Sequence, residues 1–399
     1  MKKIYHKIRR FLAKIWLDIN LQLTVVGVTG SYGKTTTVRA ISDVLSSKYS
    51  VNKTDINLDT IYNLPITILK TKIWNEILVL EYGVDHVGEM DFHLSLARPK
   101  IAVLTGITPV HADKDLLGSL ENIIKEKSKL IKALPEDGLA VFNWDDLYVR
   151  EIGNEFKGRK LFYGTKKEAD IWAEKIKINL EGTEFILHDG KKEILVKTGL
   201  LGYPAVYACL AAYTVAKELG VEEKMILEKF SNLKPLTGRL SVEKGPLGTT
   251  LINDAKRANP ASTIAGLRTL SELPGRKVIV LGEMGELGEY SEKMHREVGK
   301  EIGRLKIDVL LGVGPLTKYI IEEAKTSLKE KQFFWAKDVF EAAEILRKIL
   351  KKGDLLYLKA SLLRHLERVI LILEGERIDC GKIVCHNYSP CATCRKRLS

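Results

Sequence analysis

Residues 25–37 read Val-Val-Gly-Val-Thr-Gly-Ser-Tyr-Gly-Lys-Thr-Thr-Thr, and this stretch decides the fold of the region around it. The β-branched residues at its start favour a strand, and Gly-Lys-Thr opens a helix. The turn between them contains Gly30 and Gly33, whose backbone can adopt conformations that direct N–H groups at phosphate oxygens. The stretch therefore predicts a phosphate-binding loop between a strand and a helix.

The chemistry of such a loop depends on a few residue types. The helix N-terminus adds positive potential, the ammonium of Lys34 reaches the phosphates, and the hydroxyl of Thr35 binds Mg²⁺. The usual pattern G-x-x-x-x-G-K-[ST] is not fully met, because Val28 stands at its first glycine. A glycine turn that binds no ligand is the alternative. We expect the nucleotide to contact Gly30, Ser31, Gly33, Lys34, Thr35 and Thr36.

The chain as a whole has the composition of a globular protein. It has 399 residues, of which 45% are hydrophobic and 29% charged, a size at which about two or three domains are usual. It lacks an apolar run long enough to span a membrane and a recognisable signal peptide, so we expect a cytoplasmic protein. The formal charge of +12 suits nucleotides or an anionic membrane surface; without a nucleic-acid-binding motif we expect no nucleic-acid partner.

Residues 1–20 show a basic amphipathic pattern that predicts a helix. Lysines and arginines alternate with apolar residues spaced by three and four, namely Ile4, Ile8, Phe11, Leu12, Ile15, Trp16 and Ile19. We expect the apolar stripe to dock onto the body of the protein. Contact with an anionic membrane surface is the alternative.

From Leu23 onward, expected strands alternate with expected helices. The strands are 23–28, 77–81, 101–105 and 139–142, the helices include 34–47 and 119–134, and a β-rich stretch at 159–198 precedes a helix at about 204–219. This alternation predicts an α/β fold with a mostly parallel sheet covered by helices on both faces. Glu81, His111 and Asn143 follow strands, and ligands collect at the carboxyl ends of parallel strands. We therefore expect these residues to share a site with the phosphate loop.

A second, smaller Rossmann-like α/β domain is expected after a linker that contains Pro235 and Gly238. Its expected strands are 249–253, 277–281, 308–313 and 354–359, and its helices include 260–272 and 289–305. The predicted parts are an N-terminal helix (1–22), a nucleotide-binding domain (23–236), a second domain (237–376) and a Cys-rich tail (377–399).

Further motifs follow in order along the chain. They include Glu81-Tyr-Gly-Val-Asp-His, Thr105-Gly-Ile-Thr-Pro-Val-His111, Glu126-Lys127, Asn143-Trp-Asp-Asp, Gly238-Arg239-Leu240, Asn253-Asp254-Ala-Lys256 and Lys359-Ala-Ser. Together with the T-G-S-x-G-K-T-T loop, they make residues 23–376 resemble the Mur ligase family, and most of all its D-alanyl-D-alanine-adding members. The resemblance implies an ATP-dependent amide ligase that joins an amino acid or dipeptide to a cell-wall peptide precursor through an acyl phosphate.

The resemblance also implies a catalytic set of Lys34, Glu81, His111 and Lys127. Thr35 and Glu81 would hold one Mg²⁺, and His111 with a carbamylated Lys127 would serve a second. From the residues alone, two alternatives stay open. Lys127 can be a solvated helix residue, and His111 can simply form a hydrogen bond in its loop.

Nucleotide contacts from both domains are implied as well. Asn143 would contact the adenine or order its loop, and a structural turn is the alternative. Arg239, Asp254 and Lys256 would approach the nucleotide from the second domain, with Asp254 on the ribose and Lys256 on the γ-phosphate. Closure across the linker would complete the site.

Two departures from the family leave the substrates open. The family's N-terminal UDP-sugar domain is not matched before the phosphate loop, and Lys256-Arg257 replaces the Tyr-Asn of D-alanyl-D-alanine-adding members. The expected partners are a nucleotide-linked peptide precursor and an amino acid or dipeptide, acted on by a monomer. The alternatives are a ligase for pseudomurein or another γ-linked peptide, and a P-loop nucleotide-binding protein without ligase activity.

The tail contains Cys380, Cys385, Cys391 and Cys394. The last pair has the C-x-x-C spacing of metal ligands, so a structural zinc held by the four thiolates is one prediction. Free or redox-labile thiols are the alternative.

Overall fold

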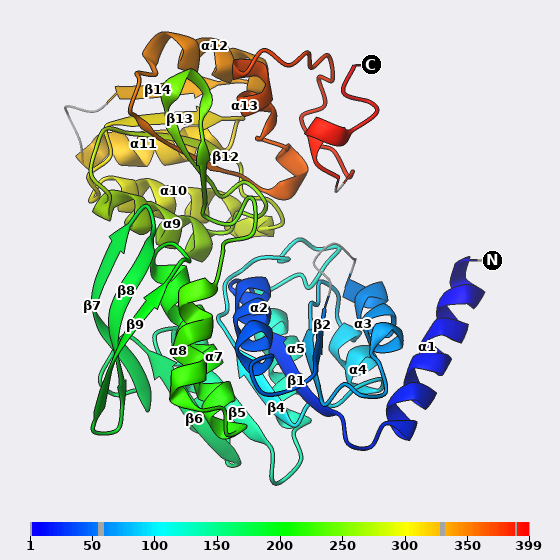
Figure 1. Cartoon of the computed structure of the whole chain (residues 1–399). Helices are drawn as coiled ribbons and strands as arrows, with labels where there is room; N and C mark the ends of the chain where they lie inside the picture. Colours follow the sequence, from blue (N-terminus) through cyan, green and yellow to red (C-terminus); the bar gives the residue numbers. More distant parts are fainter. Residues whose placement is uncertain (1, 55–59, 328–331, 388, 399) are drawn as a thin grey trace. The chain divides into compact units, whose positions relative to one another are not determined.

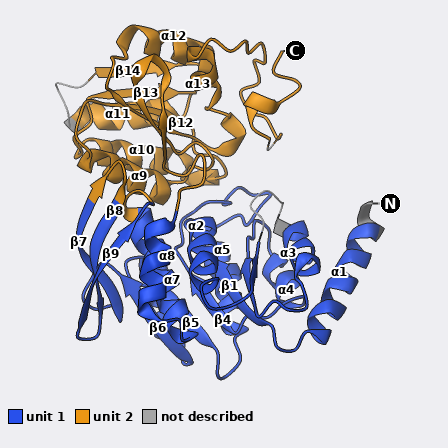
Figure 2. Ribbon diagram, viewed as in Figure 1, with its two compact units in different colours: residues 1–177, 183–199, 204–233 blue, residues 178–182, 200–203, 234–399 orange. Residues whose placement is uncertain are grey.

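The structure is a computed structural model that describes residues 2–54, 60–327, 332–387 and 389–398 (Figure 1). It divides into two compact units, each built around its own sheet (Figure 2). Unit 1 comprises residues 1–177, 183–199 and 204–233, and unit 2 comprises residues 178–182, 200–203 and 234–399. The N-terminal helix belongs to unit 1 and the Cys-rich tail to unit 2.

Unit 1 is built on a sheet of nine strands in the order β2-β3-β1-β4-β5-β6-β7-β8-β9. The pairs from β2 to β7 are parallel, and β8 and β9 are antiparallel. Strands β4 and β5 are buried along their whole length, as expected where helices cover both faces of a parallel sheet. The helices are α1 (Lys2–Ile19), α2 (Lys34–Leu45), α3 (Thr60–Lys70), α4 (Glu89–Leu94), α5 (Leu120–Lys132), α6 (Leu147–Glu155), α7 (Tyr203–Glu218) and α8 (Glu223–Asn232). The strands are β1 (Thr24–Thr29), β2 (Val51–Lys53), β3 (Ile77–Glu81), β4 (Ile101–Leu104), β5 (Leu139–Asn143), β6 (Arg159–Gly164), β7 (Ile171–Asn179), β8 (Gly182–Asp189) and β9 (Lys192–Thr198).

Unit 2 is built on a six-stranded sheet in the order β10-β11-β15-β12-β13-β14, parallel except at the β10–β11 edge. Alternate residues of β12 point to opposite cores: Ile279 packs with α9 and α10, and Val280 packs with α12 and α13. The strands are β10 (Ser241–Lys244), β11 (Thr250–Asn253), β12 (Lys277–Gly282), β13 (Val309–Val313), β14 (Gln332–Ala336) and β15 (Leu355–Lys359). The helices are α9 (Pro260–Glu272), α10 (Ser291–Ile302), α11 (Thr317–Ser327), α12 (Val339–Ile349) and α13 (Arg368–Leu373), with short 3₁₀ turns at Pro246–Gly248, Gly288–Tyr290, Leu362–Arg364 and Cys391–Thr393.

The predicted α/β architecture is confirmed, with two differences in detail. The helix expected at 289–305 is a 3₁₀ turn followed by α10, which ends at Ile302. Several elements were not predicted, among them β2, β10 and β14. These strands lie at or next to a sheet edge, where short, half-exposed segments carry a weak hydrophobic pattern.

The N-terminal helix forms as predicted, but its apolar stripe does not dock onto the body. Instead, α1 packs on unit 1 through His6, Arg10 and Ala13. Five residues of the predicted stripe are exposed, namely Ile8, Phe11, Leu12, Ile15 and Ile19. Trp16 is partly buried, and the side chain of Ile4 lies outside the described part of the chain.

Candidate active site

The phosphate loop joins β1 to α2 as predicted. Gly33 has φ 76° and precedes the first residue of α2, a conformation that a residue with a side chain adopts only under strain. At Gly30 a Cβ atom would lie 2.1 Å from Oγ1 of Thr105, so the backbone there depends on glycine. Lys34 Nζ donates a hydrogen bond of 2.7 Å to the carbonyl oxygen of Gly30. The loop thus has a helix N-terminus and an ammonium group at one place, which suits an anion.

The segment after β4 holds this loop in shape. The N–H of Ser31 donates to the carbonyl of Gly106 at 2.7 Å. The Ser31 hydroxyl donates to the carbonyl of Thr108 at 3.0 Å and accepts from its N–H at 3.1 Å. The predicted nucleotide contact Ser31 therefore also fixes the loop through its own side chain.

Asn143 lies buried at the end of β5, where its side chain supports the backbone. Its amide donates to the carbonyl of Thr105 at 2.9 Å, and its oxygen accepts from the N–H of Asp145 at 3.1 Å. Asp146 accepts from the hydroxyl of Tyr32 at 2.7 Å and caps α6 through the N–H of Val149. Burial and the carboxylate of Asp146 raise the pKa of Tyr32 well above its usual value. These contacts order the loop, and the bond from Asp145 to Asn143 is also what the alternative of a structural turn predicts.

Glu81 ends β3 beside the phosphate loop. The parallel register pairs it with Val28, which precedes the loop by two residues. Its N–H donates a hydrogen bond of 2.9 Å to the hydroxyl oxygen of Thr54, and the residue is partly exposed. The sheet therefore brings a carboxylate next to the turn that carries Lys34 and Thr35, as the sequence predicted.

His111 is buried in the loop after β4, with a left-handed φ of 66°. Its Nδ1 lies 3.0 Å from the carbonyl oxygen of Val84, which assigns the ring proton to Nδ1. His93, which the sequence did not single out, bonds through Nε2 to the neighbouring carbonyl of Gly83 at 2.9 Å. Burial lowers the pKa of His93 to about 4, so it is neutral in the folded protein. Two histidines thus fix the segment that follows Glu81.

Lys127 lies on α5 and is 1% exposed, so it is not the solvated helix residue considered as an alternative. Burial, and then the nearby charge of Lys34, lower its pKa well below the usual value for lysine. Asp85, Glu126 and Glu89 oppose this shift through charge alone, with no hydrogen bond to Lys127 among the described residues. A buried amine with a depressed pKa carries a lone pair and is a nucleophile.

A cluster that the sequence reasoning missed lies on the Glu81 motif. The cluster consists of one ligand atom from each of three residues, Asp85, His86 and Glu89, and these atoms lie within 4.8 Å of one another. Burial raises the pKa of Glu89 to about 7. A signal was present, since Asp85 and His86 end the quoted motif and Glu89 follows three residues later, but only the fold shows that the three side chains converge.

The predicted residues of unit 2 form their own group. Asp254 follows β11, and its Oδ2 accepts from Nζ of Lys359 at 2.5 Å and from the hydroxyl of Tyr357 at 3.0 Å. Burial lowers the pKa of Lys359 in spite of this partner. Lys256 donates its N–H to the carbonyl of Gly238, next to Arg239, and its stem lies against Gly238. Arg239, Asp254 and Lys256 thus all belong to unit 2, and Lys256 lies beside the linker segment that carries Arg239.

The four tail cysteines do not assemble into one cluster within the described residues. Among the described residues, Cys391 is the tail cysteine that belongs to a group of three ligand atoms within 4.8 Å of one another, together with His365 and Glu367. His365 is 2% exposed, and its Nδ1 bonds to Glu367 at 2.8 Å. The buried guanidinium of Arg368 donates to the carbonyls of Cys380 and Lys382 and holds the tail on unit 2.

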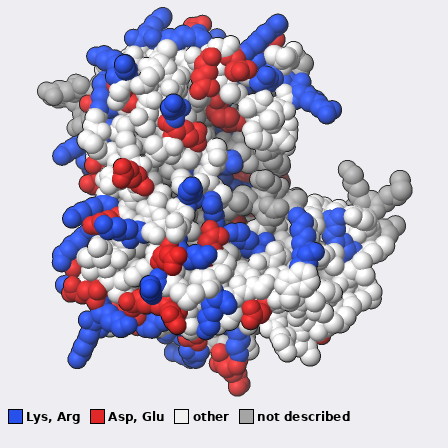
Figure 3. All heavy atoms as spheres, viewed as in Figure 1, with Lys and Arg blue, Asp and Glu red and all other residues white. Residues whose placement is uncertain are grey.

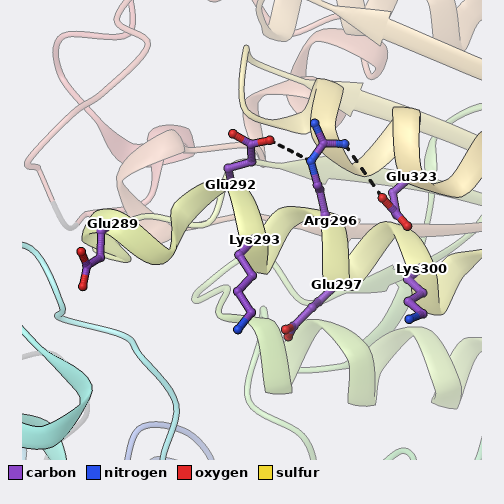
Figure 4. Close-up of a pocket in the computed structure, with 7 residues that line it drawn as sticks. All are labelled: Glu289, Glu292, Lys293, Arg296, Glu297, Lys300 and Glu323. Carbon is purple, nitrogen blue, oxygen red and sulfur yellow. Dashed lines mark hydrogen bonds and ion pairs between the residues drawn. The ribbon is translucent and has the colours of Figure 1, made fainter.

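A separate depression of about 510 Å³ lies on the surface of unit 2 along α10 (Figure 4). Glu and Lys side chains alternate around it, and Arg296 reaches Glu292 at 2.8 Å and Glu322 at 3.1 Å. Because these charges neutralise one another in an open site, we do not assign it a ligand.

Comparisons with known proteins match both units. Residues 28–216 match the family model of the Mur ligase middle domain, and residues 238–362 match that of the Mur ligase glutamate ligase domain. The UDP-N-acetylmuramoyl-tripeptide–D-alanyl-D-alanine ligase of Bacillus subtilis is 33% identical over 361 residues, which cover 90% of this chain and 77% of the relative. The ligase of the same name from Escherichia coli is 31% identical, over 75% of this chain and 66% of the relative.

Solved structures agree with the sequence matches. MurF ligase from Thermotoga maritima, in complex with ADP, is 29% identical with a TM-score of 0.80, over 93% of this chain and 84% of that chain. MurF from Acinetobacter baumannii is 25% identical with a TM-score of 0.84, over 93% and 81%. A pseudomurein peptide ligase from Methanothermus fervidus, at 20% identity and a TM-score of 0.68, shares the fold.

Proposed function

This chain belongs to the Mur ligase family, and from that membership we propose that it joins D-alanyl-D-alanine to a UDP-N-acetylmuramoyl tripeptide in an ATP-dependent, ADP-forming reaction of peptidoglycan synthesis. The observation that carries the proposal is that unit 1 contains both the phosphate loop and a buried lysine, Lys127 of α5, whose pKa is lowered in part by the charge of Lys34. The nucleotide part is supported by the ADP complex of the Thermotoga relative.

The reaction has two steps. A carboxylate oxygen of the peptide attacks the γ-phosphorus of ATP, ADP leaves, and an acyl phosphate forms. The amine of the dipeptide then attacks the acyl carbon, loses a proton and expels phosphate, which leaves an amide. Both steps bring anions together, so positive charge at the phosphates lowers the barrier. Lys34 and the N–H groups of Gly33 and the first turn of α2 supply it.

The donor set beside the loop fits Mg²⁺. The hydroxyl of Thr35 and the carboxylate of Glu81 are oxygen ligands of the kind that hard cations prefer. The β1–β3 register places Glu81 opposite Val28, shortly before the loop that leads to Thr35. His111, with its proton on Nδ1, would offer Nε2 to a second ion. When bound, Mg²⁺ neutralises the phosphate oxygens and the charge that develops on them.

Lys127 fits a carbamylated ligand. Its amine is buried, and burial and the charge of Lys34 lower its pKa, which favours the neutral form that attacks CO₂. The carbamate would place an anion near Lys34, where a protonated Lys127 would be repelled. It would also provide oxygens for the second Mg²⁺.

The remaining nucleotide contacts are proposed for both units. Asn143 would stand near the adenine while it holds the loop. In unit 2, Arg239 and Lys256 would bind phosphates and Asp254 the ribose, and Lys359 holds the Asp254 side chain in place through a hydrogen bond.

In the tail, we propose a structural zinc ion centred on Cys391 rather than on four thiolates. His365 and Glu367 supply nitrogen and oxygen next to that thiol, a donor set that Zn²⁺ accepts. Metal analysis of the purified protein tests this. Cys391→Ser should release the metal and Cys380→Ser should not; loss of zinc in both variants would favour the four-thiolate site of Cys380, Cys385, Cys391 and Cys394.

We place the reaction in the cytoplasm and expect the chain to act as a monomer on its nucleotide-linked substrate. Among the described residues, none of the helices is long and apolar enough to cross a bilayer. A ligase for pseudomurein or another γ-linked peptide is the second candidate, because the Lys256-Arg257 pair departs from the D-alanyl-D-alanine-adding pattern.

The decisive experiment measures ADP release with UDP-linked peptides and a panel of amines, with mass detection of the product. We expect product only when ATP, the muramoyl tripeptide and D-alanyl-D-alanine are all present. Lys34→Ala should lower turnover by at least ~10³-fold while the circular dichroism spectrum is retained. Product from a different amine would move the assignment to the second candidate, and ATP hydrolysis without any amide would contradict ligation.

A further inference from the structure

Helix α1 is fixed to unit 1 through one face only. The ring of His6 stacks on Tyr62 with centroids 4.0 Å apart. The guanidinium of Arg10 lies 3.3 Å from the ring centre of Phe92 and donates to its carbonyl at 2.8 Å. Ala13, on the same face, is fully buried. These contacts hold the helix in a defined orientation on the protein.

The opposite face of α1 is apolar and exposed. Ile8, Leu12, Ile15 and Ile19 follow one another at spacings of four, three and four, which aligns them along one side of a helix. Their exposed fractions run from 39% for Ile15 to 62% for Ile19, and Tyr5 and Phe11 beside them are 59% and 65% exposed. Figure 3 shows the surface over α1 as largely white, with Lys and Arg atoms along part of its border. A contiguous apolar stripe of this kind usually marks a binding surface.

The apolar surface continues beyond the end of the helix. Leu21 is 88% exposed, and the following residues lead into β1, where the N–H of Thr24 donates to the carbonyl of Glu76 at 2.9 Å. Just before Glu76, Ile73 and Trp74 are 61% and 67% exposed. Tryptophan is enriched where a protein meets the interface of a lipid bilayer.

The charges of α1 determine which partner fits. The helix has six lysines and arginines and a single acidic residue, Asp18. Lys7 and Lys14, two turns apart, are exposed, and Arg9 lies over the ring of Tyr5. A second copy of the same helix would bring like charges together, whereas anionic lipid headgroups would attract them.

We propose that the exposed face of α1, together with Leu21, Ile73 and Trp74, docks this protein on the surface of an anionic membrane. The helix lies in the membrane interface rather than across the bilayer, because its other face, which carries Arg10, is packed on unit 1. The proposal goes beyond the ligase activity and does not depend on it. It would hold an enzyme with water-soluble substrates next to the bilayer.

Flotation of the full-length protein with lipid vesicles tests this. We expect the protein to float with vesicles of phosphatidylglycerol and phosphatidylcholine at low salt and to stay behind with phosphatidylcholine alone. Added salt should release it, because screening weakens the attraction to lipid headgroups. The double variant Ile8→Asp/Phe11→Asp and the double variant Lys7→Glu/Lys14→Glu should each reduce the bound fraction at least tenfold.

The controls are matched substitutions elsewhere on unit 1. Leu195→Asp changes an apolar residue that is 50% exposed on β9, and Lys191→Glu reverses an exposed charge. Both should float like the wild type. ADP release in solution should stay at the wild-type level in every variant, which separates membrane docking from the reaction.

Two results would overturn the proposal. The first is no flotation of the wild-type protein with anionic vesicles at low salt, or flotation that Ile8→Asp/Phe11→Asp leaves unchanged. The second is a dimer in light scattering that this variant converts to a monomer, which would assign the face to a second copy of the chain.

Discussion

Two buried lysines, one in each unit, show how similar side chains take different roles. Lys359 in unit 2 is 2% exposed and donates to Asp254 at 2.5 Å and to the carbonyl of Arg257 at 3.0 Å. Lys127 in unit 1 is 1% exposed, and its acidic neighbours act on it only through charge. Burial lowers the pKa of both. Lys359 is a structural ion-pair partner, whereas Lys127 forms no such pair among the described residues and is the lysine that we propose takes part in the reaction.

The largest effect is expected when the Lys359–Asp254 ion pair of unit 2 is broken. Lys359→Met should lower the free energy of unfolding by about 3–5 kcal/mol, because it leaves the buried carboxylate of Asp254 without its cation. Urea unfolding followed by tryptophan fluorescence measures the change. The double variant Lys359→Met/Asp254→Asn should recover part of the loss, and additive effects of the two substitutions would contradict the ion pair.

The matching substitution in unit 1 should affect activity rather than folding. Lys127→Met should reduce ligase turnover by about 100-fold, or about 2.7 kcal/mol, without loss of stability, because no ion pair is broken. Lys125→Met, at an exposed position of the same helix, is the control. In the wild type, ¹³C-labelled bicarbonate should give a carbamate signal in NMR spectra that Lys127→Met lacks; an unchanged turnover in that variant would remove Lys127 from the catalytic set.

A smaller effect is expected on the pH dependence of stability, because the imidazole of His93 in unit 1 is buried. The pKa of His93 falls from 6.5 to about 4 because the ring is buried. Between these values the unfolded chain binds more protons than the folded one, so stability is full above pH 6.5 and is lost as the pH falls toward 4. We expect a loss of roughly 2 kcal/mol over this range. His93→Gln should flatten the dependence of the free energy of unfolding on pH between 6.5 and 4. If the variant and the wild type lose stability in parallel, the loss does not come from His93.

The smallest effect is expected at exposed ion pairs, where substitution tests how much an ion pair stabilises the fold when it is not buried. On the surface of unit 2, Arg296 of α10 pairs with Glu292 of the same helix and with Glu322 and Glu323 of α11; Figure 4 draws Arg296, Glu292 and Glu323. Arg296→Ala should cost under about 1 kcal/mol, because water and salt screen exposed ion pairs. Thermal unfolding at low and high salt measures it. A cost equal to that of Lys359→Met would mean that burial does not set the strength of these pairs.

The positions of the candidate site residues could be predicted where they depend on short stretches of backbone. The strand, turn and helix around Gly33 follow from residue types that are adjacent in sequence, and so does the position of Glu81 at a strand end. His111 and Asn143 were likewise found from the strands that precede them. The roles of Tyr32, Lys359 and His93 were not, because their partners lie 114, 105 and 10 residues away and no local pattern links them.

By itself, the sequence determined the α/β class, the phosphate loop and the family, because strand and helix periodicity and glycine geometry act over a few residues. Only the tertiary structure decided that Lys127 is buried among charges while Lys359 is paired, and that the apolar stripe of α1 faces outward. Burial and pairing depend on contacts between distant segments. The same helical pattern in α1 is compatible with either orientation until His6 and Arg10 meet their partners on unit 1.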